Sequence, residues 1–455
     1  MTVSPSTSID PAGRPGPRAI PSGIRAEGRV EVPPSKSVTH RFLNLALLAG
    51  AASSGALGST SSITLENPLD AEDTRLFLRA LEAVGFAVER GEREVRLALG
   101  PRALPVEDEA PVEIFCGNAG TMFRFLAASL AAIPGRFRLD GTPRLRERPV
   151  GPLVEAVRRL GGAVDYLGQA GFPPLAILGG TLRGGTTTLD AGSSSQYLSA
   201  LLMAGLAARE PVGIELAALT SEPYVDVTLA VAEAFGGRIE RPSPTAFRVH
   251  PSPLSLDRAR VEGDWSAAAY PAAMAVLTGG RVRLEGLSER SAQGDRAFLD
   301  LLVAMGGQAV WANGELTVSG TGRLRAAEAD LSRMPDQVPT LAALAPFASG
   351  VTRIGNVRHL RIKESDRLHA MATGLRALGA EVDEHPDGLD ILGVWAEAEP
   401  PGDPVAIETF DDHRIAMSFA LVGLRRPGVA IVAPGVVAKS YPEFWRDFER
   451  LTAPR

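Results

Sequence analysis

The feature that most constrains the fold of this chain is an internal repeat, in which an amphipathic helix ends at glycine and runs into an apolar strand. Leucine and valine recur at spacings of three and four residues, which places them on one face of a helix. The glycine stands where a helix C-terminus needs a positive φ. The chain closes with EFWRDFERL, which we interpret as the last helix of a sixth copy. The five complete copies, about 75 residues apart, end at Gly85, Gly161, Gly236, Gly306 and Gly379.

A second segment repeats in step with the first. Each copy opens with a polar cluster and continues as a nearly all-apolar stretch such as YLSALLMAGLAA. A helix that is apolar all round is buried on all sides, whereas its first turn has free N–H groups that need partners. Alternating segments such as GRFRLDG and RVRLEG predict short strands, so each unit would combine helices and strands. The simplest packing places three of these units in each of two globular bodies. The polar openings are Ser35-Lys36-Ser37, Gly117-Asn118-Ala119-Gly120-Thr121, Ser193-Ser194-Ser195-Gln196, Asp264-Trp265-Ser266, Pro335-Asp336-Gln337 and Asp411-Asp412-His413-Arg414.

Two of these openings carry a cation, Lys36 or Arg414, at the predicted helix start. Helix N-termini are partly positive and favour anions, so a cation there opposes the helix dipole. Ordinary capping explains the Ser, Thr, Asn and Asp residues of the openings but not these two cations. We therefore favour bound anions at the helix starts over capping alone.

Composition excludes several classes of protein. The chain has 455 residues and a net charge of −6, which argues against a nucleic-acid-binding surface. No apolar run predicts a membrane span. The Pro-, Ser- and Gly-rich residues 1–18 predict a disordered tail without a secretory signal. A single cysteine, Cys116, suits a reducing compartment, and the six histidines show no metal-binding spacing. We expect a cytoplasmic protein with no metal and no cofactor.

Nine motifs, in this order and in register with the repeat, resemble the 3-phosphoshikimate 1-carboxyvinyltransferase family, also called 5-enolpyruvylshikimate-3-phosphate (EPSP) synthase. The resemblance implies an α/β fold of two inverted, barrel-like domains of the β-prism type. It implies six βαβαββ repeats, three per domain, with the active site in the interdomain cleft. One domain would be discontinuous, residues 1–34 and 262–455, and residues 35–261 would form the inserted domain. The motifs are PPSKSVTHR (33–41), GNAGTMFR (117–124), GTPRLRERPVG (141–151), SSSQYLSALLM (193–203), TSEPYVDVT (220–228), MPDQVPTLAALA (334–345), RIKESDRLHAMATGLRALGAEV (361–382), DDHRIAMSFAL (411–421) and AKSYPEFW (438–445).

The family's reaction transfers the enolpyruvyl (1-carboxyvinyl) group of phosphoenolpyruvate to the 5-hydroxyl of shikimate 3-phosphate and releases phosphate. It proceeds through a tetrahedral intermediate and belongs to the shikimate pathway, which leads to chorismate and the aromatic amino acids. Arg and Lys suit these anionic substrates, because they bind carboxylate and phosphate groups. By resemblance, phosphoenolpyruvate contacts Lys36, Gly120, Arg148, Gln196, Arg367, Arg414 and Lys439. Shikimate 3-phosphate contacts Lys36, Ser37, Arg41, Ser194, Ser195, Gln196, Ser221, Tyr224, Asp336 and Lys363.

The resemblance assigns the catalysis to Asp336, Glu364, Lys36 and His413. The 5-hydroxyl must lose a proton while the methylene carbon of phosphoenolpyruvate gains one, and two carboxylates suit these transfers. Asp336 would be the base near the 5-hydroxyl, and Glu364 the acid and base at the methylene carbon. Asp336 also fits a helix N-cap, and His413 also fits a structural role. Cys116 is interpreted as a small buried filler.

Three positions depart from the family pattern. His359 stands where the family usually has an Asn that touches shikimate 3-phosphate, Phe125 stands where Pro is common, and Ala433 replaces the Asp that commonly precedes Pro434. Glyphosate competes for the phosphoenolpyruvate site in this family, and the presence of Gly120 predicts that it binds.

Two other interpretations remain open. A related enolpyruvyl transferase acts on UDP-N-acetylglucosamine and carries a reactive Cys in a long loop, which no segment here matches. A non-catalytic repeat scaffold accounts for six units but gives no reason for Asp336, Glu364 and the basic residues in the matching motifs. We expect a monomer that binds two small substrates, contacts neither nucleic acid nor membrane, and closes on binding shikimate 3-phosphate.

Overall fold

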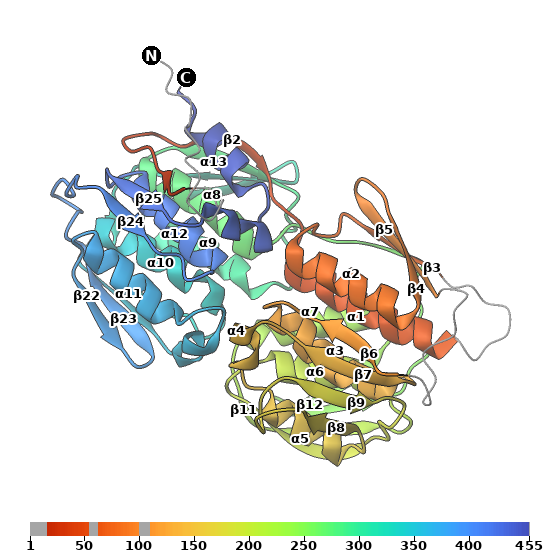
Figure 1. The fold of residues 1–455 in the computed structure, drawn as a ribbon. Coiled ribbons are helices and arrows are strands. Elements are labelled where there is room, and N and C mark those ends of the chain that lie inside the picture. The colour runs from red at the N-terminus through yellow and green to blue at the C-terminus, as the bar shows by residue number, and fades with distance from the viewer. Residues whose placement is uncertain (1–15, 54–61, 100–109, 455) are drawn as a thin grey trace. The chain divides into compact units, whose positions relative to one another are not determined.

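The computed structural model describes residues 16–53, 62–99 and 110–454, and the chain divides into two compact units (Figure 1). Unit 1 combines the start of the chain, through Pro33, with Gly263–Arg455. Unit 2 is the continuous segment Pro34–Glu262. Each unit has its own hydrophobic core.

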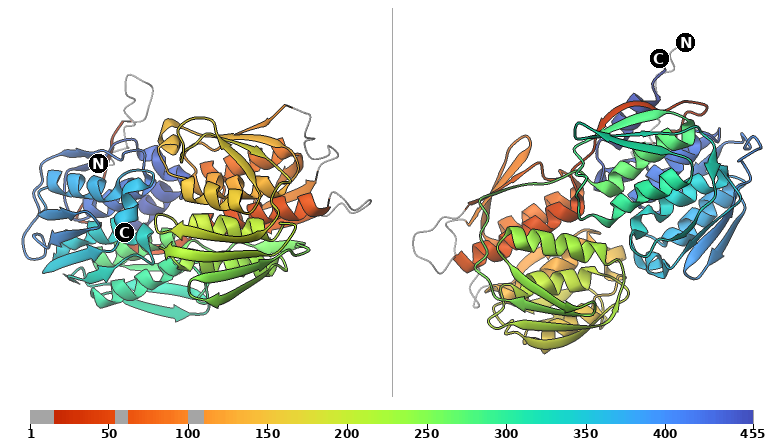
Figure 2. Two further views of the ribbon diagram at one scale, coloured as in Figure 1. Left: turned by 90° about the horizontal axis from the view of Figure 1, so that it is seen from below. Right: turned by 180° about the vertical axis from the view of Figure 1, so that it is seen from behind.

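Small mixed sheets surround the helices of each unit (Figure 2). In the described part of unit 2, three sheets share one pattern, in which a parallel pair is extended by two antiparallel strands. In sheet order, the strands are β14 (Arg258–Arg260), β3 (Ser62–Glu66), β5 (Glu94–Leu99) and β4 (Phe86–Arg90); β6 (Val112–Phe115), β7 (Arg136–Asp140), β9 (Leu175–Leu178) and β8 (Ala163–Tyr166); and β10 (Gly185–Ala191), β11 (Val212–Leu219), β13 (Ala246–His250) and β12 (Arg238–Ser243).

Unit 1 repeats this pattern in two four-stranded sheets and shortens it in a third, which has three strands. The expected mixed α/β class with repeated small sheets is therefore confirmed. In sheet order, the strands are β2 (Glu27–Glu31), β15 (Arg281–Glu285), β17 (Glu315–Ser319) and β16 (Gln308–Ala312); β19 (Glu328–Asp330), β21 (Val351–Gly355), β23 (Gly388–Leu392) and β22 (Val382–His385); β24 (Val405–Ile407), β25 (Val429–Ile431) and β1 (Arg18–Ala19); and the separate pair β18 (Leu324–Arg325) and β20 (Ala348–Ser349).

The start of the chain supplies the third strand of the shortened sheet, because β1 pairs antiparallel with β25. Ile20 is buried next to this strand, and the guanidinium of Arg18 lies 4.5 Å from the ring centroid of Trp445. The expected disordered tail is therefore wrong at Arg18, since strand pairing and burial fix this residue. Residues 1–15 of that expected tail lie outside the described residues.

Three buried helices pack against one another in each unit. Their starts coincide with the predicted polar openings, because these openings hold the polar groups that a buried first turn needs. In unit 2 the helices are α1 (Lys36–Ser53), α3 (Gly120–Ala132) and α6 (Gln196–Gly205). In unit 1 they are α8 (Trp265–Thr278), α10 (Val338–Leu344), which follows the 3-10 helix η2 (Pro335–Gln337), and α12 (His413–Gly423).

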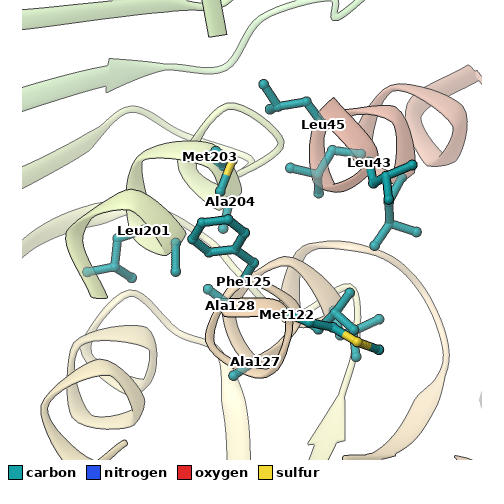
Figure 3. Packing of buried hydrophobic residues seen from close by; sticks show 14 of the residues in the cluster. Leu43, Leu45, Met122, Phe125, Ala127, Ala128, Leu201, Met203 and Ala204 are labelled. Carbon is teal, nitrogen blue, oxygen red and sulfur yellow. The ribbon is translucent and has the colours of Figure 1, made fainter. Parts of the chain in front are cut away.

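Figure 3 shows part of the core of unit 2, with Phe125 among other buried apolar side chains. The Phe125 ring points from α3 toward Met203 and Ala204 of α6, and its side chain is fully buried. The guanidinium of Arg41 lies 5.3 Å from its ring centroid. With Phe125 in place of the family's Pro, α3 continues without a break from Gly120 to Ala132, and the Phe125 ring packs against the guanidinium of Arg41.

The glycines that end the outer helices have the predicted left-handed backbone. Their φ values lie between 77° at Gly236 and 116° at Gly85 and Gly306. No helix in the described part of the chain is long and apolar enough to cross a membrane. The outer helices are α2 (Glu72–Val84), α5 (Gly151–Arg159), α7 (Pro223–Ala234), α9 (Phe298–Ala304), α11 (Arg367–Ala377) and α13 (Phe444–Thr452). Shorter helices are α4 (Pro143–Arg146), η1 (Gly294–Ala297), η3 (Ala345–Phe347), η4 (Arg358–Ile362) and η5 (Pro434–Lys439).

Candidate active site

Arg41 is a buried cation of unit 2, and all its hydrogen-bond acceptors among the described residues are neutral. Its Nε donates to Thr228 Oγ1 (2.7 Å), its Nη1 to the Ser37 carbonyl (2.9 Å), and its Nη2 to the Tyr224 carbonyl (2.8 Å) and to Ser199 Oγ (3.4 Å). Burial lowers the pKa of Arg41 to about 10, so the residue stays cationic at neutral pH. Burying a charge without a counter-charge is costly, so this arrangement favours an anionic ligand.

Arg148 lies directly against the start of α3. A Cβ atom added at Gly120 would lie 2.6 Å from Arg148 Cζ. Arg148 Nη1 donates to the carbonyl (3.2 Å) and to Oδ1 (3.4 Å) of Asn118. The guanidinium is therefore held at a helix N-terminus, where both the cation and the free N–H groups attract an anion.

Gln196, at the start of α6, is fixed from two sides. Its Oε1 accepts from Arg124 Nη1 (2.7 Å), and its Nε2 donates to Thr121 Oγ1 (3.0 Å). The second acceptor of Arg124 is the Pro149 carbonyl (3.2 Å). Arg124 thus positions Gln196 and joins the starts of α3 and α6.

Lys36 is the first residue of α1 and forms an ion pair with a carboxylate. Its Nζ lies 3.4 Å from Oδ2 of Asp73, whose side chain is 5% exposed. Burial lowers the pKa of the neighbouring His40 to about 3, against the opposite effect of Asp73, so its ring is neutral. Lys36 therefore has Asp73 as a counter-charge, and it also lies at a helix N-terminus, where an anion can bind. We call Lys36, Arg41, Arg124 and Arg148 the basic set.

The expected hydroxyl ligands of unit 2 lie in or just before the first turns of α1, α6 and α7. Ser194 and Ser195 are buried immediately before α6, and the Ser195 hydroxyl makes no capping bond to the helix. Ser37 is in the first turn of α1, and Tyr224 lies in α7, with its carbonyl on Arg41. Ser221 is buried with φ at 53°, a left-handed value unusual for serine.

In unit 1, Arg367 joins three carboxylates. Its Nε donates to Asp412 Oδ2 (2.8 Å), its Nη1 to Asp336 Oδ1 (2.7 Å) and its Nη2 to Glu364 Oε2 (3.0 Å). The side chain of Arg367 is 2% exposed and that of Asp412 is fully buried. The sequence predicted site residues at α11, η2 and α12 separately, and the guanidinium of Arg367 connects these three elements. We call Asp336, Glu364, Arg367, Asp412 and Arg414 the carboxylate set.

Asp336 is held by two guanidinium groups, because Arg414 Nη2 also donates to its Oδ2 (2.8 Å). Burial alone would raise the pKa of Asp336, but Arg414, Arg367 and Lys363 together lower it well below its usual range. Asp336 is therefore ionised at neutral pH and can accept a proton only when its surroundings become less positive.

Three further residues of unit 1 that the sequence singled out, His359, His413 and Lys439, are also buried. Burial lowers the pKa of His359 to about 3, aided by Lys363, so the residue at the family's Asn position is a neutral imidazole. His413 begins α12 and is buried, with Nδ1 3.6 Å from Asp412 Oδ1. Lys439 is buried at the end of η5, whose first turn follows Ala433 at φ 47°.

The structure thus groups the expected residues within each unit. Unit 2 contains Lys36, Ser37, Arg41, Gly120, Arg148, Ser194, Ser195, Gln196, Ser221 and Tyr224, and unit 1 contains Asp336, Lys363, Glu364, Arg367, His413, Arg414 and Lys439.

Sequence reasoning did not assign a role to Asp73 or Asp412, the carboxylates that partner Lys36 and Arg367. Asp412 could have been found, since it lies in the same polar opening as Arg414. Cys116 is fully buried, and burial raises the pKa of its thiol well above its usual value. It is therefore a poor nucleophile, which agrees with its interpretation as a core filler.

Comparison with known proteins matches residues 21–448 to a family described as EPSP synthase (3-phosphoshikimate 1-carboxyvinyltransferase). A 3-phosphoshikimate 1-carboxyvinyltransferase of Bordetella avium (strain 197N) is 40% identical over 455 residues, covering 95% of this chain and 98% of the relative. That of Syntrophobacter fumaroxidans (strain DSM 10017 / MPOB) is 44% identical over 434 residues, covering 94% and 98%. The solved EPSP synthase of Acinetobacter baumannii matches with a TM-score of 0.75 and 28% identity, covering 96% of this chain and 98% of that one. The enolpyruvyl transferase NikO from Streptomyces tendae has a similar fold, with a TM-score of 0.74 and 19% identity.

Proposed function

The chain belongs to the EPSP synthase family and has 3-phosphoshikimate 1-carboxyvinyltransferase activity in the shikimate pathway, and we propose that its basic set and its carboxylate set act together on the two substrates. The observation that carries this proposal is the contrast between the two sets. Arg41 is bonded to neutral oxygens, whereas Arg367 is bonded to three carboxylates. The first arrangement suits anion binding, and the second brings together carboxylates of the kind that proton transfer needs.

In this proposal, shikimate 3-phosphate binds to unit 2. Arg41, Ser194 and Ser195 would hold its phosphate, and Tyr224 would flank its ring. An incoming phosphate supplies the counter-charge that the neutral acceptors around Arg41 do not. Phosphoenolpyruvate would bind between Lys36, Arg148 and Gln196 of unit 2 and Arg367, Arg414 and Lys439 of unit 1, so the substrates would bridge the two units.

The binding of phosphoenolpyruvate would also activate Asp336. Arg367 and Arg414 hold Asp336 at 2.7 and 2.8 Å. Carboxylate and phosphate groups arriving on these guanidinium groups offset their positive charge, so the pKa of Asp336 rises toward the value that a base needs. The base would therefore become active only when the substrate is present.

The chemistry then needs two proton transfers and one leaving group. Asp336 removes the proton of the 5-hydroxyl as its oxygen forms a bond to C2 of phosphoenolpyruvate, while Glu364 gives a proton to C3. In the tetrahedral intermediate, the bond between C2 and the phosphate oxygen breaks and phosphate leaves with the bonding pair. The phosphate takes up the proton that Asp336 removed, and a C3 proton returns to Glu364. Lys36 and His413 would assist by stabilising charge near the reacting atoms.

A phosphate-release assay tests the proposal. We expect the purified protein to release phosphate from phosphoenolpyruvate with shikimate 3-phosphate as acceptor, and a product heavier than the acceptor by one enolpyruvyl group. Phosphate release only with UDP-N-acetylglucosamine would assign the related transferase instead. Release with neither acceptor would favour the non-catalytic scaffold.

We further propose that the two units are inverted, barrel-like domains that close when shikimate 3-phosphate binds. The enzyme would be monomeric and cytoplasmic. Small-angle scattering should show a smaller radius of gyration with shikimate 3-phosphate than without it. Light scattering should give the mass of one chain, 47.8 kDa. An unchanged radius would contradict closure, and a larger mass would contradict the monomer.

A further inference from the structure

A short segment of unit 1, Gln293–Asp295, connects two helix starts and contains a buried carboxylate that the proposed mechanism does not use. Asp295 Oδ1 accepts a hydrogen bond of 2.8 Å from Gln337 Nε2. Asp295 is 3% exposed and Gln337 is fully buried. Gln337 directly follows Asp336 in the 3-10 helix η2, so Asp295 holds the turn that carries the proposed base.

The same segment also forms hydrogen bonds to Gly263 and Trp265, where the chain returns from unit 2 to unit 1. Gln293 Oε1 accepts from the backbone N–H of Trp265 (3.1 Å), and its Nε2 donates to the Gly263 carbonyl (2.9 Å). The next residue, Asp264, donates its backbone N–H to the Pro33 carbonyl (2.8 Å). Gln293 therefore binds one of the two connections between the units directly, at Gly263, and the other connection, at Pro33, is bonded to Asp264 beside it.

Charged groups on three elements act on the carboxylate of Asp295. Asp336 of η2 and Asp264, the N-cap of α8, repel an ionised Asp295, whereas Arg414 of α12 attracts it. Burial is the largest influence and, with the two carboxylates, raises the pKa of Asp295 to about 6 in spite of Arg414 and the bond from Gln337. Near neutral pH, Asp295 is thus mostly ionised and adds a negative charge beside Asp336.

We propose that Asp295 is a positioning residue for Asp336: its carboxylate fixes the Gln337 amide and hence the η2 turn, and its charge opposes the positive field of Arg367 and Arg414 around Asp336. The inference rests on the proposed function, since it assigns Asp336 the role of base. It extends that function by giving the base a buried carboxylate as a partner.

The test compares Asp295→Asn with the wild type and with Asp300→Asn, a matched control on an exposed carboxylate of the neighbouring helix α9. Asparagine retains an oxygen that can accept from Gln337 but has no charge. We expect Asp295→Asn to lower kcat about tenfold, to change KM by less than about twofold, and to remove an inflection near pH 6 from the pH profile of kcat. Asp300→Asn should match the wild type. A profile of Asp295→Asn that retains the inflection and the wild-type kcat would overturn the proposal.

A second readout does not depend on turnover. In protein carrying 13C-labelled aspartate carboxyls, the resonance of Asp336, assigned by its loss in Asp336→Asn, should shift near pH 6 in the wild type as Asp295 titrates. This shift should be absent in Asp295→Asn. If the Asp336 resonance behaves identically in both proteins, Asp295 does not act on Asp336, whether or not the protein is active. If the resonances differ but the wild type does not release phosphate, the proposed function fails while the coupling stands.

Discussion

The guanidinium of Arg148 occupies the space that a side chain at Gly120 would need. A Cβ atom at Gly120 would lie 2.6 Å from both Cζ and Nη2 of Arg148, closer than non-bonded atoms can approach. Only glycine at position 120 therefore leaves room for Arg148 where the structure places it.

Gly120→Ala should weaken the use of phosphoenolpyruvate, because Arg148 must move away from the start of α3. We expect its KM for phosphoenolpyruvate to rise about tenfold, which corresponds to about 1.4 kcal/mol, with little change in the unfolding temperature. Gly355→Ala is the matched control, because a Cβ atom there meets no atom within 4 Å. Steady-state kinetics measure both variants, and an unchanged KM in Gly120→Ala would contradict the assignment of Arg148.

Arg41→Gln should separate ligand binding from stability. The substitution removes a cation, but Thr228 Oγ1 retains its bonds to Ser199 Oγ (2.8 Å) and to the Tyr224 carbonyl (3.0 Å). We expect the affinity for shikimate 3-phosphate to fall about 100-fold, or about 2.7 kcal/mol, because a charged hydrogen bond to phosphate is lost. Calorimetric titration measures the affinity, and thermal unfolding should show a change of only a few degrees. Wild-type affinity in this variant would show that Arg41 does not bind the phosphate.

Asp336→Asn should remove the proposed base without disturbing the shape of η2. General-base catalysis contributes about 100- to 10,000-fold to a rate, so we expect kcat to fall by at least about 100-fold. Rapid-quench measurement of the first turnover isolates the chemical step. A first-turnover rate near that of the wild type would show that another group takes the proton.

Asp412→Asn should destabilise unit 1 rather than alter substrate recognition. Asp412 is fully buried and bonds to Arg367, and its Oδ1 also accepts from the Arg414 backbone N–H (3.0 Å). Asparagine can still cap α12 but leaves Arg367 with less counter-charge, so we expect a loss of about 3 kcal/mol in the free energy of unfolding. Urea denaturation measures this loss, with Asp411→Asn as an exposed control. Equal stability of the two variants would contradict the prediction.

Asp295→Asn should stabilise the protein in a pH-dependent manner. The pKa of Asp295 is about 6 in the folded chain and about 4 in an unfolded one, so the folded state binds the proton more tightly. This carboxyl therefore lowers the free energy of unfolding progressively as the pH rises from about 4 to about 6, and the loss remains above pH 6. Removing the carboxyl should raise stability by about 2 kcal/mol at pH 7.5 and by much less at pH 4.5. Urea denaturation at the two pH values measures the difference, and a gain that is larger at pH 4.5 would refute the assigned direction.

The repeat, the positions of the buried helices and the glycine-capped outer helices could all be predicted from the sequence. These features depend on short-range patterns: apolar spacing within one helix, polar groups in its first turn and a glycine after its last. The start of α12 at His413 and the left-handed backbone at Gly379 follow directly from such patterns. The motifs around Asp336, Arg367 and Arg414 also predicted candidate site residues, through their resemblance to a family.

Only the tertiary structure determined which of these residues touch. Arg367 and Asp412 are 45 residues apart, and Asp295 and Gln337 are 42 apart, so their pairing depends on how separate helices pack. The pairing of β1 with β25 joins residues from opposite ends of the chain, and no local pattern near Arg18 announces it. Local patterns set the shape of each element, because backbone hydrogen bonds and side-chain spacing act over a few residues. The charge state of a buried group such as Asp336 depends on neighbours that only the packed core brings within a few ångströms.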